Sequence, residues 1–219
     1  MNCCCPHARS GGRIFSFFAR NYRKRFSKKG FEPSQRQLME GLSQAGFQNT
    51  SVLEIGSGVG HFHMSLLEAG AATATGIDLA PKMIAEAEDW SRQRGLEERI
   101  TYHQGDFMEI LPLIEPADVT VLDKVVCCYP DADGLVHQSL SKTRRVYALT
   151  YPRDRRLVRL GVALAALLMK FIGSSFRPYA HSPAIIEEWI TARGFHKRYE
   201  KTTFVWLTQV YVKNGCAPA

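Results

Sequence analysis

The chain has 219 residues, of which 45% are apolar and 22% are charged. This length suits one domain with a hydrophobic core, and this composition excludes a chain that is disordered throughout. The net charge is +7, and the basic residues gather in the first thirty positions and between Lys142 and Arg159. These stretches do not form an aromatic-interleaved basic stripe of the RNA-binding kind, which favours a solvated positive face over a nucleic-acid site.

The cysteine pattern indicates a reducing compartment. Adjacent thiols are a poor disulfide framework, so we expect a cytoplasmic protein with free cysteines. The N-terminus lacks the apolar stretch of a signal peptide. The longest apolar run, residues 157–172, is shorter than the roughly 20 residues that a membrane-spanning helix needs. The six cysteines are Cys3, Cys4, Cys5, Cys127, Cys128 and Cys216.

The N-terminal part is expected to be helical and basic. Residues 1–30 are rich in Gly, Ser and Arg, so we predict a partly disordered segment with a short helix over residues 15–26. A second helix is predicted over residues 34–45, because Pro33 suits a helix start and Gly46 suits a helix end.

From residue 51 onward, strands and helices alternate. The predicted strands cover residues 51–55, 73–77, 100–103, 117–122 and 146–150. The predicted helices between them cover residues 61–69, 81–94 and 134–141. One strand and one helix for every 25 to 30 residues or so indicates βαβ crossovers and a parallel sheet.

The C-terminal part follows a different pattern. A helix over residues 184–193 precedes two strands, 195–200 and 203–212, with only a short turn between them. Such a pair is an antiparallel hairpin. We therefore predict an α/β fold with a doubly wound, mostly parallel, seven-stranded Rossmann-like sheet. The domain would cover residues 31–214, with a helical insertion at about 153–181.

A glycine-rich loop follows the first predicted strand. Gly56, Gly58 and Gly60 permit positive φ and close approach of a ligand to the backbone. Asp78 ends the next strand, where a carboxylate can accept hydrogen bonds from ribose hydroxyls. A dinucleotide fingerprint needs its third glycine one residue later, at the position of His61. The spacing therefore argues against NAD or FAD.

Four stretches carry a resemblance to a known family. They are VLEIGSGVG at 52–60, GIDL at 76–79, GDF at 105–107 and ADVTVLD at 117–123. Residues 51–124 thereby resemble the class I S-adenosylmethionine-dependent methyltransferases. The resemblance implies S-adenosylmethionine as cofactor and methyl transfer as the reaction.

The resemblance also implies roles for ten residues. Asp78 would accept hydrogen bonds from the ribose, with Leu79 against the adenine. Asp106 would accept from the adenine amino group, with Phe107 beside the ring. The residues implied to line the methionine end are Glu54, Gly56, Gly58, Gly60, Asp123 and Lys124.

The methyl acceptor should lie beyond the carboxyl ends of the fourth and fifth strands. Tyr129 would orient the acceptor, and His181 would be a general base, because the pKa of a histidine can be set near 7. The alternatives are a loop tyrosine and a structural histidine. The order of elements has a looser likeness to magnesium-protoporphyrin O-methyltransferases, which makes a planar hydrophobic carboxylate one candidate acceptor.

The apolar run 157–172 has a cluster of arginines at its start, where cations are unfavourable for the helix dipole. We therefore predict a lid over a small hydrophobic acceptor that carries an acidic group. Contact with a membrane surface or a partner is the other interpretation, and a buried helix is a third. The arginines are Arg153, Arg155, Arg156 and Arg159.

Two other functions stay open. The cysteines would suit a metalloid or thiol methyltransferase, and the fold would also suit a non-catalytic regulatory module that binds the cofactor. The spacing of Cys3, Cys4, Cys5 and His7 matches no zinc site, so no metal is expected. No motif of a nucleic-acid methyltransferase follows the fourth strand, which favours a small-molecule acceptor over DNA or RNA.

Overall fold

Seven strands form one sheet in the order β3-β2-β1-β4-β5-β7-β6. The computed structural model describes residues 6–171, 174 and 176–215. Cys3, Cys4, Cys5 and Cys216, and Ile172 at the end of the apolar run, lie outside these residues. The strands are β1 (Ser51–Ile55), β2 (Thr73–Asp78), β3 (Ile100–Gln104), β4 (Ala117–Asp123), β5 (Thr143–Pro152), β6 (Phe195–Thr202) and β7 (Trp206–Lys213).

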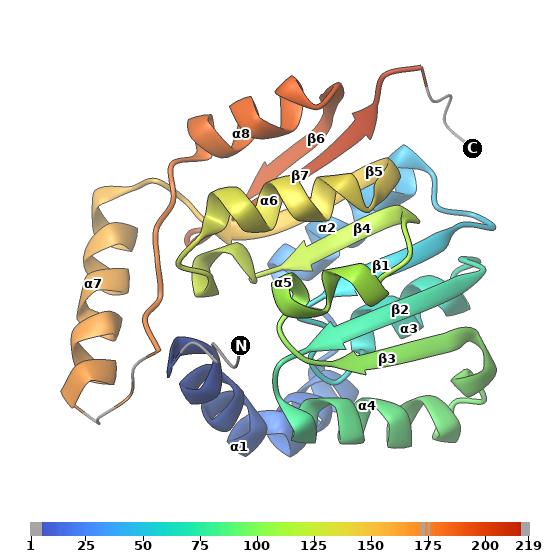
Figure 1. Cartoon of the computed structure of the whole chain (residues 1–219), viewed down its shortest axis with the longest axis horizontal. Helices are drawn as coiled ribbons and strands as arrows, with labels where there is room; N and C mark the ends of the chain where they lie inside the picture. The colour runs from blue at the N-terminus through green and yellow to red at the C-terminus, as the bar shows by residue number, and fades with distance from the viewer. Residues whose placement is uncertain (1–5, 172–173, 175, 216–219) are drawn as a thin grey trace.

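The helices flank this sheet (Figure 1). They are α1 (Pro6–Lys29), α2 (Pro33–Ala45), α3 (His61–Glu68), α4 (Pro81–Gln93), α5 (Phe107–Ile110), α6 (Ala132–Ser141), α7 (Arg156–Phe171) and α8 (Pro183–Ala192). Short 3-10 turns lie at η1 (Glu97–Arg99), η2 (Leu111–Leu113) and η3 (Val126–Cys128).

The direction of the strands confirms the predicted fold class. Strands β1 to β5 pair in parallel, and β7 runs antiparallel to both β5 and β6. On β1, Glu54 lies opposite Gly76 of β2 and Val121 of β4. The carboxyl ends of these three strands therefore lie side by side at one edge of the sheet (Figure 1).

The two faces of the sheet pack against different helices. Side chains alternate between faces along a strand, so Val52 joins the core shared with α1 to α4, while Leu53 joins the core shared with α5, α6 and α8. On β4, Val121 and Leu122 divide in the same way. Both faces are buried, as is usual for a sheet built from βαβ crossovers.

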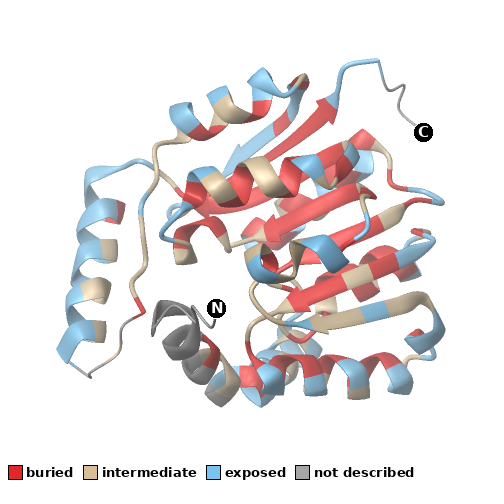
Figure 2. Cartoon of the chain, viewed as in Figure 1, coloured by how far each residue is buried: buried red, intermediate tan, exposed pale blue. Residues whose placement is uncertain are grey.

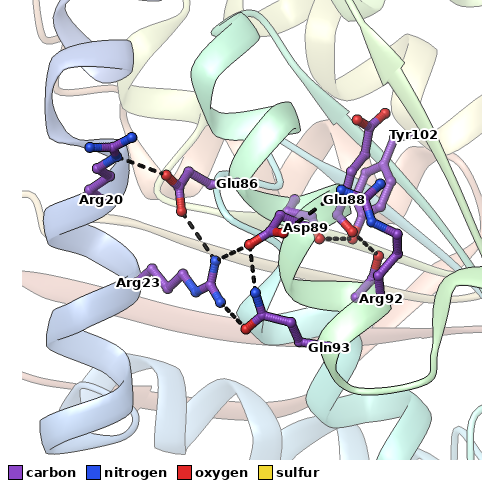
Figure 3. A network of polar contacts seen from close by, with 10 residues as sticks. Arg20, Arg23, Glu86, Glu88, Asp89, Arg92, Gln93 and Tyr102 are labelled. Carbon is purple, nitrogen blue, oxygen red and sulfur yellow. Dashed lines mark hydrogen bonds and ion pairs between the residues drawn. The ribbon is translucent and has the colours of Figure 1, made fainter.

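Helix α1 is longer than predicted and packs against α4. The predicted helix over residues 15–26 lies within Pro6–Lys29. Arg23 donates to Asp89 at 2.8 Å and to Glu86 at 3.3 Å, and it also binds Gln93 (Figure 3). Its guanidinium group lies 5.4 Å from the centre of the Trp90 ring. These contacts with α4 hold the second half of α1 against the body of the protein.

Helix α7 stands apart from both layers (Figure 1). It lies within the predicted insertion at 153–181, and most of its surface is exposed (Figure 2). Within the described residues, no helix combines the length and the apolar content needed to cross a bilayer.

Candidate functional site

The loop between β1 and α3 requires glycine at the predicted positions. Gly56, Gly58 and Gly60 have φ angles of 70°, 55° and 78°. A Cβ atom on Gly56 would lie 2.4 Å from Cγ2 of Val125. Ser57 N donates to the carbonyl of Ile77 on β2 at 2.8 Å, which ties the loop to the neighbouring strand. The loop therefore presents its backbone at the carboxyl edge of the sheet.

Asp78 holds this loop in place. Its Oδ2 accepts from Gly58 N at 2.8 Å, and its Oδ1 accepts from Ala80 N at 2.8 Å. Burial raises the pKa of the Asp78 carboxyl to about 6, although both backbone hydrogen bonds favour the charged form. The carboxylate thus already organises the backbone at the position predicted to bind a ribose.

Glu54 forms a buried pair with a histidine that sequence reasoning missed. Its Oε2 lies 2.6 Å from Nδ1 of His63 and accepts from His63 N at 3.2 Å. Nε2 of the same ring lies 3.0 Å from the hydroxyl of Tyr102 on β3. His63 stands nine residues after Glu54 and 39 before Tyr102, so no local sequence pattern connects the three residues.

Asp106 caps the short helix α5, since its Oδ1 accepts from Met108 N at 3.0 Å. Phe107 is buried in the core that contains α5, α6 and α8, and one side of it reaches the site. Leu79 lies directly after β2 and also lines the site.

One cavity of about 830 Å³ brings the predicted residues together. Nine of the ten residues assigned to the cofactor line it, and Gly60 is the exception. Tyr129 lines it as well, whereas His181 is absent from its walls. The cavity extends beyond the sheet to residues that sequence reasoning did not select: Phe15, Tyr22, Arg25 and Phe26 of α1, Gln35 of α2, and Phe176.

Four buried polar atoms on this cavity have no hydrogen-bond partner among the described residues. They are Ser57 Oγ, His61 Nδ1, Asp123 Oδ1 and Tyr129 Oη. Buried polar groups are normally paired in folded proteins. Their gathering around one cavity indicates that it binds a ligand with several polar groups, as S-adenosylmethionine has.

The sequence profile described as "Methyltransferase domain" matches residues 52–147. A ribosomal protein L11 methyltransferase of Edwardsiella ictaluri is 28% identical over 165 residues, which are 74% of this chain and 49% of that protein. One from Deinococcus radiodurans is 32% identical over 76 residues, which are 35% of this chain and 28% of that protein. The chain thus spans half or less of the length of these relatives.

The chain carries a class I S-adenosylmethionine-dependent methyltransferase domain. A magnesium protoporphyrin IX methyltransferase from Synechocystis, solved with S-adenosylmethionine, aligns with a TM-score of 0.70 at 17% identity, covering 98% of this chain and 100% of that one. An O-methyltransferase family 2 protein from Planctomyces limnophilus, solved with apigenin, aligns with a TM-score of 0.66 at 19% identity, covering 89% and 61%. These likenesses show the fold.

In this methyltransferase domain, Asp123 ends β4 and lines the cavity. Its Oδ2 accepts from Nε2 of Gln35 at 2.8 Å. Burial raises the pKa of the Asp123 carboxyl. Gln35 also lies 2.9 Å from Nε2 of His61, and burial lowers the pKa of His61 to about 4. His61 is therefore neutral near pH 7.

Lys124 adopts a left-handed backbone conformation, with a φ of 61°. This conformation is costly for a residue with a side chain and is common at functional sites. Its Nζ lies 2.6 Å from Oε2 of Glu32, and Arg25 binds the other oxygen of Glu32 at 2.8 Å. Burial alone would raise the pKa of Glu32, but the two cations hold that pKa below its ordinary value.

The two predicted catalytic residues occupy different places in the methyltransferase domain. Tyr129 follows η3 and faces the cavity. His181 lies behind it, and its Nε2 donates to the carbonyl of Tyr129 at 3.2 Å. Burial lowers the pKa of His181. The sequence does not predict this contact between His181 and the Tyr129 backbone, because the two residues are 52 positions apart.

The arginine cluster does not line the cavity. Arg155 and Arg156 are exposed, and Arg153 donates to the carbonyl of Thr203 at 2.9 Å. Helix α7 is also absent from the cavity walls. Among the described residues of the 153–181 segment, Phe176 is the one that lines the cavity. The cations that do reach the cavity are Arg25 and Lys124.

Proposed function

We propose that this protein transfers a methyl group from S-adenosylmethionine to a small hydrophobic acceptor that carries an acidic group. The observation that carries the proposal is the cavity of about 830 Å³, in which the motif residues adjoin an aromatic region. Small-molecule sites span about 300–1,000 Å³. This volume supports a cofactor and an acceptor bound side by side.

We assign the sheet edge of the cavity to the cofactor. Asp78 would accept from the ribose, Leu79, Asp106 and Phe107 would surround the adenine, and Glu54 with the glycine loop would face the methionine part. S-adenosylmethionine supplies an activated methyl group on a sulfonium. The chain then has to align the acceptor and exclude water, which is where most of the rate enhancement of such a reaction arises.

We assign the aromatic end of the cavity to the acceptor. Phe15, Tyr22 and Phe26 from α1 line the cavity together with Tyr129 and Phe176. Arg25 and Lys124 would bind the acidic group, in competition with Glu32. A carboxylate acceptor needs no base at neutral pH. We therefore propose that Tyr129 orients the acceptor. His181 would position Tyr129 and would not transfer a proton.

The likeness to a magnesium protoporphyrin IX methyltransferase supports a planar carboxylate as one candidate. The likeness to a protein solved with apigenin supports an aromatic acceptor in general. The relatives that act on ribosomal protein L11 match this chain over half or less of their own length, so we rank a protein acceptor below a small molecule.

A second candidate is methylation of a thiol or metalloid. The Sγ atoms of Cys127 and Cys128 lie 3.9 Å apart, and Cys128 lines the cavity. The hydrogen bond with Cys128, together with burial, raises the pKa of the Cys127 thiol well above its ordinary value. A protonated thiol is a poor ligand for a metalloid, which ranks this candidate second.

A methyl-transfer screen with isotopically labelled S-adenosylmethionine tests the proposal. We expect label on hydrophobic aromatic and tetrapyrrole acids, and none on their methyl esters, which serve as matched controls. Tyr129→Phe should reduce the turnover of the best acid more than it changes cofactor affinity. Label on thiols or arsenite alone would favour the second candidate, and label on ribosomal protein L11 alone would favour a protein acceptor. Cofactor binding without any transfer would indicate a regulatory module.

A further inference from the structure

Helix α7 carries large apolar side chains that the described part of the chain leaves uncovered. Figure 2 shows most of this helix in the colour of exposed residues. Each of these side chains is half or more exposed to solvent. Isolated exposed leucines are normal on protein surfaces, but a contiguous group of them usually marks a binding surface. The group, called the leucine face below, consists of Leu157, Leu160, Leu164, Leu167, Leu168 and Phe171.

The leucine face is one continuous stripe. Its members follow one another at intervals of three, four, three, one and three residues, which places them on one side of a helix. Val158 is buried, and Val162, Ala165 and Met169 are half-buried on the other side. Helix α7 is therefore fixed to the protein by one face and presents a second apolar face to its surroundings.

Basic residues flank the leucine face at both ends of α7. Arg155 directly precedes α7, Arg156 is its first residue, and Lys170 lies in its last turn. The helix contains no acidic residue. Asp154, just before it, is paired with Arg159 at 2.6 Å. Cations weaken a helix at its N-terminus, so the two arginines are better explained by something that α7 binds.

The segment that follows α7 leads back to the acceptor end of the cavity. Phe176 lines the cavity and packs edge-on against Phe15, with ring centres 5.5 Å apart. Tyr179 N donates to the carbonyl of Cys127 at 2.7 Å. A partner on the leucine face would therefore bind a helix that is followed, a few residues later in the chain, by residues that shape the site.

We propose that the leucine face and its flanking arginines dock α7 onto an anionic lipid surface, with the leucines inserted among the acyl chains and the arginines among the headgroups. An apolar stripe with basic residues beside it is the pattern of helices that lie in a bilayer interface. An anionic surface would neutralise Arg155, Arg156 and Lys170, whereas a second copy of the chain would bring the same cations against one another.

Docking would also bring the cavity to a source of hydrophobic acceptors. This consequence rests on the proposed function, because it assumes a hydrophobic methyl acceptor. The docking itself does not, because it requires neither cofactor nor acceptor.

Vesicle flotation of the full chain tests the docking, without cofactor or acceptor. We expect binding to vesicles of phosphatidylcholine and phosphatidylglycerol in equal parts, and much weaker binding to phosphatidylcholine alone. Replacing Leu164 and Leu168 by Ser should lower the partition coefficient at least about tenfold, since one fully buried leucine contributes more than a factor of ten. The control is Leu113→Ser, which changes a leucine that is 68% exposed on η2.

The charge contribution has its own pair of variants. Arg155→Glu should weaken binding to the anionic vesicles, and added salt should weaken binding of the wild type. Arg193→Glu is the control, because it reverses an exposed arginine after α8. Equal losses in the two variants would show that overall charge, and not the arginines of α7, drives binding, and would overturn this part of the proposal.

Two results would overturn the proposal as a whole. One is a wild type that stays away from anionic vesicles, or a leucine variant that binds them as well as the wild type does. The other is a dimer that the leucine substitutions dissociate, without vesicle binding, which would assign the leucine face to a second copy. If the double variant misfolds, Leu164→Trp gives an independent measurement, because its fluorescence should shift to the blue on anionic vesicles. Methyl transfer to a water-soluble acid is measured separately, so the two proposals can fail independently.

Discussion

At the scale of single residues, we expect Asp78 to couple cofactor binding to pH. Burial raises its pKa to about 6 in the protein without cofactor. Ribose hydroxyls donate to the charged carboxylate and so favour it, which lowers the pKa when the cofactor binds. Below about pH 6, binding must therefore release a proton. We predict that cofactor affinity falls by up to about tenfold per pH unit below pH 6 and is flat just above it.

Titration calorimetry across this range measures the effect. The control is Asp78→Asn, which should bind about 1.5–3 kcal/mol more weakly near neutral pH and lose the dependence that belongs to this carboxyl. Asp123 also has a raised pKa, and the Asn variant separates the two residues. A wild-type affinity that does not change below pH 6 would contradict the role given to Asp78.

At the scale of elements, α1 contributes Phe15, Tyr22 and Phe26 to the cavity wall and is held by Arg23. Its guanidinium side chain is 20% exposed and binds both Glu86 and Asp89 on α4 (Figure 3). Arg23→Ala should lower the free energy of unfolding by about 1–2 kcal/mol, because such hydrogen bonds are charge-assisted but partly screened by solvent. Arg20→Ala is the matched control, since that side chain is 85% exposed and its loss should cost less than about 0.5 kcal/mol. Urea denaturation compares them, and equal midpoints would show that Arg23 does not anchor α1.

At the scale of the whole molecule, cofactor binding should stabilise the fold, since the cavity joins β1, β2 and β4 to α1 and α2. A ligand at one hundred times its Kd adds about 2.7 kcal/mol. For a domain of this size that corresponds to a rise in Tm of about 5–10 °C. Thermal unfolding should show this rise with S-adenosylmethionine or its demethylated product and none with NADH. A rise with NADH alone would refute the cofactor assignment.

The central β–α part could be predicted from the sequence because its signals are local. The segment Ser51–Ile55 is a strand, as predicted, and the glycines after it adopt positive φ. Other boundaries shifted where pairing with a neighbour decides them. β5 begins at Thr143 and not at residue 146, because Thr143 pairs with Ala117 of β4. The four-residue helix α5 has too few residues to show a period.

The class of fold and ten residues of the cavity, the nine assigned to the cofactor and Tyr129, followed from the sequence by itself, because parallel strands bring their carboxyl ends to one edge whatever the loops do. The cofactor followed from the resemblance of the four motif stretches to a known family. Only the tertiary structure decided which side chains meet at this edge. The pair of Glu54 and His63, the aromatic residues of α1 at the cavity and the contact of His181 with the Tyr129 backbone all join segments that no periodicity relates. Only the tertiary structure also decided which way the leucines of α7 face. An apolar helix has the same sequence pattern whether its leucines face a cavity, a core or solvent.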